Sequence, residues 1–98
     1  MTITHKKDGD KLTIAISGRL DSTTSGEFTD FLDHNFTPDI QDLTLDFAGV
    51  DFISSKGLRV LVSLYKNLNG KQLKIINANT SVKEVFRLSA LLTIFNIK

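Results

Sequence analysis

Two adjacent serines, Ser54 and Ser55, occupy the position in this sequence that is best suited to chemistry. They follow an alternating apolar run and precede Leu58 and Leu61, which recur at helical spacing, so a strand is expected to pass into a helix here. The first turn of a helix has free N–H groups and a partial positive charge, which suit an anion. A serine there is also an ordinary helix N-cap, because its side-chain oxygen accepts one of those N–H groups. Residue types alone favour the cap.

Other arrangements that would indicate an enzyme are missing. His5 and His34 are isolated and are expected on the surface. Asp8 and Asp10 flank a turn glycine, but the later glutamate of a calcium loop is absent. No glycine-rich phosphate loop follows a strand, and without cysteine there is no thiol nucleophile, disulfide or thiolate metal site. We therefore expect a binding protein rather than an enzyme, with no metal and no cofactor.

Composition indicates an ordinary soluble domain. The chain has 98 residues, 41% of them hydrophobic and 23% charged, which leaves room for one domain only. Its formal net charge of +1 gives no strong attraction to nucleic acid or to anionic membranes. The N-terminus lacks an apolar signal core and no later run is long enough to span a bilayer, so a cytoplasmic location is expected.

The elements that must position the serines follow from the apolar pattern. A turn at 8–10 is expected to close a hairpin between strands at 2–7 and 12–20, with further strands at 43–47, 73–77 and 93–97. Helices are expected to begin near Thr24 and Ser81, each three residues before a glutamate at capping-box spacing, and at the two serines. Gly70 is expected to terminate the second helix.

Alternation within the strands favours a sheet with one covered face. Apolar residues such as Ile14 and Leu45 point one way, whereas Thr13, Ser17 and Thr44 point the other way, and right-handed crossovers would put all the helices on the apolar side. We therefore expect a single α/β domain over 1–98, in which an N-terminal β-hairpin leads into a mainly parallel five-stranded sheet with three main helices chiefly on one face. The expected core contains Leu12, Ile14, Ile16, Leu45, Phe47, Leu61, Tyr65, Val85 and Phe86.

Several stretches resemble a known family. Residues 52–61, FISSKGLRVL, resemble the signature of the STAS domain, the fold of bacterial anti-sigma factor antagonists. Residues 17–21, SGRLD, resemble the Gly-x-Leu-Asp motif before the family's first helix, and 43–47 resemble its central strand. Residues 82–91 resemble its last helix, so the resemblance extends over nearly the whole chain.

The resemblance implies a phosphorylation-switched regulator of transcription. In such antagonists a serine at the helix start is phosphorylated by an anti-sigma factor that is also an ATP-dependent serine kinase, and only the unmodified form binds that kinase and frees the sigma factor. Ser55 is the closest match to the phosphoacceptor and Ser54 the second choice. The partner-binding residues implied by the resemblance are Asp21, Ser54, Ser55, Lys56, Gly57 and Arg59.

Two alternatives stay open. Some STAS domains are not phosphorylated and serve as accessory modules of transporter, lipid-transport or stress-signalling complexes, in which case Ser55 only caps the helix. A small nucleotide-binding domain is the other alternative, although no phosphate loop supports it.

Gly57 is expected to allow the close approach of another backbone or of a partner.

Overall fold

Turn chemistry and apolar alternation produce an N-terminal hairpin followed by alternating helices and strands. The computed structural model describes residues 1–89 and the backbone of 96–97. As predicted, a turn with Gly9 at a φ of +62° joins the first two strands. The elements in chain order are β1 (Thr2–Asp8), β2 (Lys11–Leu20), α1 (Ser25–Asn35), β3 (Asp42–Ile53), α2 (Ser55–Lys66), β4 (Gln72–Ile76), α3 (Thr80–Leu88) and β5 (Asn96–Ile97).

The strands form one mixed sheet in the order β1-β2-β3-β4-β5. β1 and β2 are antiparallel, and the pairings of β2 with β3 and of β3 with β4 are parallel. At the far edge only the two residues of β5 pair with β4. The remainder of the strand predicted at 93–97 lies outside the described residues. The chain is thus one α/β domain with an N-terminal hairpin and three described helices.

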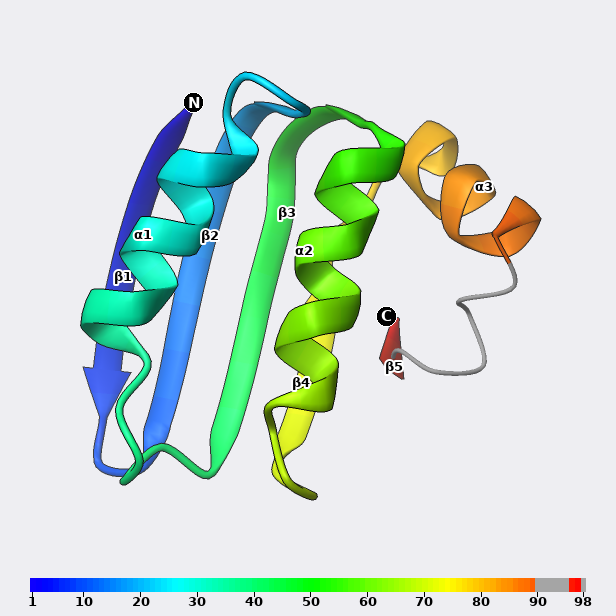
Figure 1. The fold of residues 1–98 in the computed structure, drawn as a ribbon. Coiled ribbons are helices and arrows are strands. Elements are labelled where there is room, and N and C mark those ends of the chain that lie inside the picture. The colour runs from blue at the N-terminus through cyan, green and yellow to red at the C-terminus, as the bar shows by residue number, and fades with distance from the viewer. Residues whose placement is uncertain (90–95, 98) are drawn as a thin grey trace.

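One face of the sheet is buried and the other is open, as the alternation predicted. Figure 1 shows α1 and α2 side by side over the same face, with α3 on the other side of α2, where it contacts β3. Thr13 is exposed, while Ser17 and Thr44 are half-buried on the opposite face. Of the predicted core, Leu12, Ile14, Ile16, Leu45, Phe47, Leu61 and Phe86 are buried.

Two residues of the predicted core are not buried. Tyr65 is 44% exposed, because it lies at the margin of the apolar stripe of α2 rather than at its centre. Val85 is half-buried and packs against the edge of the core. None of the described helices has the length and apolar character needed to cross a membrane.

The two predicted capping boxes are wrong. Thr24 precedes α1 but makes no side-chain capping bond, because its Oγ1 instead accepts from the N–H of Asp21 at 3.0 Å while donating to the carbonyl of Arg19 at 2.6 Å. The helix start predicted near Ser81 comes earlier, since Asn79 caps α3 by accepting from the N–H of Val82 at 2.8 Å. The second helix also ends earlier than predicted, at Lys66.

The carbonyl of Leu20 joins the end of β2 to the start of α2. It accepts a hydrogen bond from the N–H of Ser54 at 2.9 Å. Gly57, in the first turn of α2, packs against the same carbonyl, and a Cβ added there would lie 2.5 Å from the Leu20 oxygen and 3.1 Å from Cγ1 of Ile53. The glycine is therefore required by a close approach of the chain's own backbone.

We expect Gly57→Ala to destabilise the fold. The added methyl group would force the start of α2 away from β2, at a cost of about 1–3 kcal/mol in the free energy of unfolding. Gly26→Ala is the matched control, because Gly26 is also near a helix start but its Cβ would meet no atom within 4 Å. Urea unfolding of the two variants checks this, and equal stabilities would contradict it.

Candidate functional site

The predicted site residues meet at the end of the sheet where β2 and β3 finish. In the parallel register Arg19 lies opposite Phe52, and Leu20 lies opposite Ile53. The turn after β2 and the start of α2 are therefore neighbours in space (Figure 1). This register brings Asp21 close to the two serines, although they are far apart in the sequence.

Ser54 is committed to the structure of the helix. It has extended backbone angles as the N-cap residue of α2, and its Oγ accepts a hydrogen bond from the N–H of Gly57 at 3.2 Å. Its own N–H is bonded to Leu20, and the residue is half-buried. The capping role that the accessory-module alternative gave to Ser55 thus belongs to Ser54.

Ser55 is the first residue of α2 and is exposed. Its hydroxyl makes no hydrogen bond within the described part of the chain. Lys56 and Arg59 are also exposed, and Arg59 lies one helical turn after Ser55. Gly57 is buried against Leu20, so it does not share the exposed surface formed by the other three residues.

Asp21 is held inside its own turn. Its Oδ1 accepts from the N–H of Thr23 at 3.0 Å and from the Thr23 hydroxyl at 2.7 Å, and its Oδ2 accepts from Nε of Arg19 at 3.0 Å. These bonds hold the pKa of Asp21 well below its ordinary value of 3.8. The bond from the Thr23 hydroxyl contributes most to this lowering, and the bond from Arg19 is second. The carboxylate therefore remains charged, with most of its hydrogen-bonding capacity already used.

The residues Arg19 and Phe52 were not predicted as part of the site. The Arg19 guanidinium lies 4.5 Å from the centre of the Phe52 ring, and Phe52 is 40% exposed. The pair could have been predicted only from the register between β2 and β3, which places Arg19 opposite Phe52. That register contains two irregularities that the sequence does not reveal. The pair adds an apolar surface and a cation beside the serines.

The arrangement offers a modifiable hydroxyl on a cationic surface. Ser55 has Lys56 and Arg59 on its own helix and Arg19 near the end of the neighbouring strand β2. No group of three or more His, Asp or Glu side chains within the described residues could hold a metal ion. The site is suited to accepting a group from another protein and to contacting that protein.

Comparisons with known proteins agree on the fold. The STAS domain matches residues 2–98, whereas no curated protein matches. An anti-sigma factor antagonist from Mycobacterium paratuberculosis is 18% identical, with a TM-score of 0.89, covering 98% of this chain and 83% of that chain. The phosphorylated form of the Bacillus cell fate determinant SpoIIAA is 15% identical, with a TM-score of 0.75, covering 99% and 91%. Part of the murine anion transporter Slc26a9 is 17% identical, with a TM-score of 0.77, covering 90% of this chain and 15% of that chain.

We expect Asp21→Asn to lower the melting temperature at neutral pH, because the amide loses the charge-assisted bond to Arg19. Since folding lowers the pKa of Asp21, its contribution is present above the unfolded value of 3.8 and is lost as the pH falls through the lower folded value. The difference in melting temperature between the wild type and Asp21→Asn should therefore shrink in acid.

Asp30→Asn is the control, because Asp30 is an exposed carboxylate with no side-chain partner among the described residues. Thermal melts across this pH range check the expectation. A constant difference between wild type and Asp21→Asn at all pH values would contradict it.

Proposed function

Because the chain belongs to the STAS domain family, we propose that it is an anti-sigma factor antagonist controlled by phosphorylation of Ser55. In this proposal the unmodified protein binds an anti-sigma factor that is also a serine kinase, which frees the sigma factor in the cytoplasm. Phosphate on Ser55 then ends the binding. Similarity to an anti-sigma factor antagonist and to a phosphorylated STAS protein supports this class of function.

The different environments of the two serines carry the proposal. A kinase must reach the acceptor hydroxyl from solvent, and of these two serines only Ser55 presents an exposed hydroxyl without a partner among the described residues. The Ser54 oxygen is half-buried and engaged with the N–H of Gly57. Phosphorylation of Ser54 would convert the Oγ that caps α2 into an ester oxygen, whereas phosphorylation of Ser55 would leave that capping bond unchanged.

The fold is expected to tolerate a phosphate on Ser55. The group adds about −1.5 to −2 charges at the positive end of α2, where the helix dipole favours an anion. Lys56 and Arg59 supply further positive charge on the same face. The effect of the phosphate therefore falls on the partner, which would have to bury an added charge and volume without a counterpart.

A transporter accessory module is the second candidate. The similarity to part of an anion transporter supports it. In that case Ser55 is not phosphorylated, and the exposed residues at the start of α2 contact other parts of a larger assembly. The two candidates differ in their response to ATP.

The kinase partner is expected to be recovered from the native cytosol by the wild-type protein and by Ser55→Ala, but not by Ser55→Asp. Ser81→Asp is the matched control, because Ser81 is also exposed in the first turn of a helix and receives the same charge. Added ATP should release the partner from the wild type and not from Ser55→Ala. Binding titrations beside thermal melts measure this, and equal affinities of the Ser55 variants at equal stability would contradict it.

We expect the recovered kinase still to phosphorylate the Ser54→Ala variant, on Ser55. The variant loses a helix cap and about 0.5–2 kcal/mol of stability, but it keeps the hydroxyl of Ser55. Mass spectrometry of the product locates the phosphate. Phosphate found on Ser54 of the wild type would contradict the assignment of Ser55 as the acceptor. Recovery of transporter subunits regardless of ATP would favour the accessory module.

A further inference from the structure

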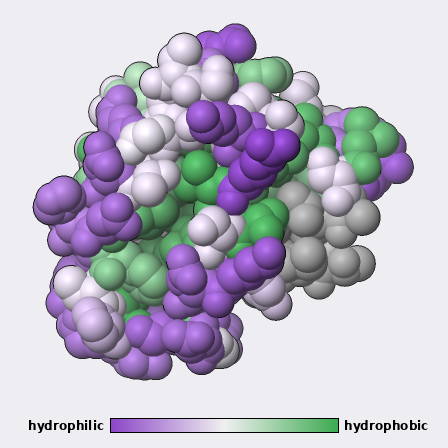
Figure 2. Space-filling view, viewed as in Figure 1, coloured by the Kyte–Doolittle hydropathy of each residue, from purple (hydrophilic) through white to green (hydrophobic). Residues whose placement is uncertain are grey.

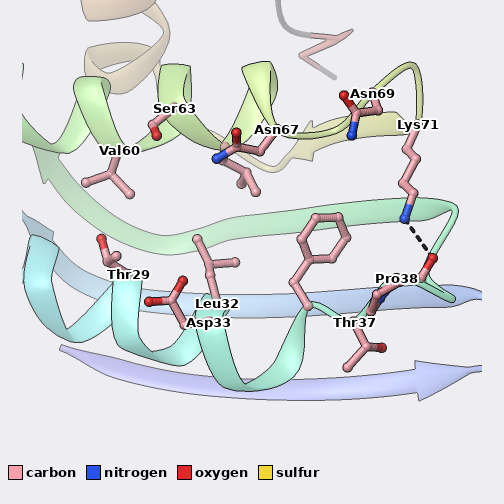
Figure 3. A pocket seen from close by; sticks show the side chains of 12 residues that line it. Thr29, Leu32, Asp33, Thr37, Pro38, Val60, Ser63, Asn67, Asn69 and Lys71 are labelled. Carbon is pink, nitrogen blue, oxygen red and sulfur yellow. Dashed lines mark hydrogen bonds between the residues drawn. The ribbon is translucent and has the colours of Figure 1, made fainter.

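A groove separates the two helices that cover the sheet. It lies between the second halves of α1 and α2, encloses about 420 Å³, and has Leu32, Phe36, Val60 and Leu64 among its lining residues (Figure 3). Lys71 closes one end by donating to the carbonyl of Pro38 at 2.8 Å. Figure 2 shows hydrophilic residues on this face around a smaller hydrophobic area.

Each of the two helices carries exposed charges of one sign. The acidic stripe on α1 consists of Glu27, Asp30 and Asp33. The basic stripe on α2 consists of Lys56, Arg59 and Lys66. Residues three or four apart share a helix face, and residues seven apart return to it, so each stripe lies along one face of its helix, with Arg59 and Lys66 two turns apart in the basic stripe. The helix layer therefore presents an acidic half and a basic half.

The two stripes do not neutralise each other within the chain. The ion pairs among the described residues join Lys7 to Asp39, Arg19 to Asp21, and Arg87 to Glu84. None of them connects α1 with α2. All six stripe residues are exposed and have no side-chain partner in the described structure, so their charges are available to another molecule.

We propose that this helix layer binds a second copy of the same chain. The two helices run side by side in the same direction (Figure 1). A rotation of 180° about an axis parallel to them, in front of the layer, places α1 of one copy over α2 of the other. The same rotation places α2 over the second α1. Each acidic stripe then faces a basic stripe, as an isologous interface requires.

A second copy fits better than an arbitrary partner because the surface is self-complementary. Every charge pair forms twice, and the half-buried Phe36 and Val60 of both grooves face each other between the stripes. The contact is small, since helices of 11 and 12 residues are only about 17 Å long. We therefore expect a weak dimer whose stability depends strongly on salt.

The dimer would cover the start of α2. Lys56 and Arg59 lie in the basic stripe and beside Ser55, so a second copy and any partner at Ser55 would exclude each other. This inference goes beyond the proposed function and does not depend on it, because the stripes and the groove exist whether or not Ser55 is phosphorylated.

Charge reversal and mixing test the proposal. In sedimentation experiments at protein concentrations up to about 1 mM, the wild type should dimerise in about 0.01 M salt and dissociate in about 1 M salt. Asp30→Arg and Arg59→Glu should each weaken the dimer about tenfold or more, because each places like charges opposite one another. An equal mixture of the two variants should form a heterodimer, since each altered stripe then faces a stripe of opposite charge.

Lys83→Glu is the matched control, because it reverses an exposed charge on α3, outside both stripes, and should leave the dimer intact. Thermal melts confirm that each variant is folded. A wild type that stays monomeric at about 1 mM in low salt overturns the proposal. A dimer that survives both reversals, or variants that fail to recover on mixing, also overturn it.

Discussion

The structure of the site depends on the close approach of α2 to the carbonyl of Leu20. This carbonyl binds the N–H of Ser54 and leaves no space for a side chain at Gly57. The chain must therefore leave β3 and enter the helix within one residue. Ser54 is held in the extended conformation of an N-cap, and Ser55 becomes the first helical residue. A buried backbone contact thus determines which serine is presented to solvent.

The same junction separates polar groups that maintain the fold from polar groups that remain available. The Asp21 carboxylate and the Ser54 hydroxyl both have partners within their own turns. Ser55 and Arg59 have no side-chain partner in the described residues. Because the first pair is fixed, a change at the second pair alters the surface without rearranging the turn. Such a division is what the proposed phosphorylation of Ser55 requires, because the surface would change while the turn keeps its shape.

The sequence was most informative where the pattern depends on only one strand or helix. Alternation has a period of two, so the buried and open faces of β2 and β3 could be predicted directly. Helix caps were harder, because neighbouring Ser, Thr and Asn side chains are all suitable acceptors and the exact start of the helix decides among them. Asn79 therefore replaced Ser81, and Thr24 bonded elsewhere.

The contacts between elements could not be predicted in the same way. The stacking of Arg19 on Phe52 depends on the register of two strands, and that register shifts at two places where β3 has one residue more than β2. Gly57 was expected to allow the close approach of a backbone or a partner, but the atom that it approaches lies in a distant segment of the chain. The roles of the two adjacent serines depend both on the pattern within α2 and on the contact of α2 with Leu20.

Each strand of the sheet lies beside the strand that precedes it in the chain. Every pairing therefore joins strands that are consecutive in the chain, and the chain can build its sheet progressively as the ribosome releases it. During synthesis, β3 can pair with β2 before β4 exists, and its outer edge is then unpaired. That edge presents the backbone N–H and C=O groups of residues 42–46, which pair with β4 in the finished sheet. Until β4 emerges, the nascent chain is thus exposed to edge-to-edge aggregation.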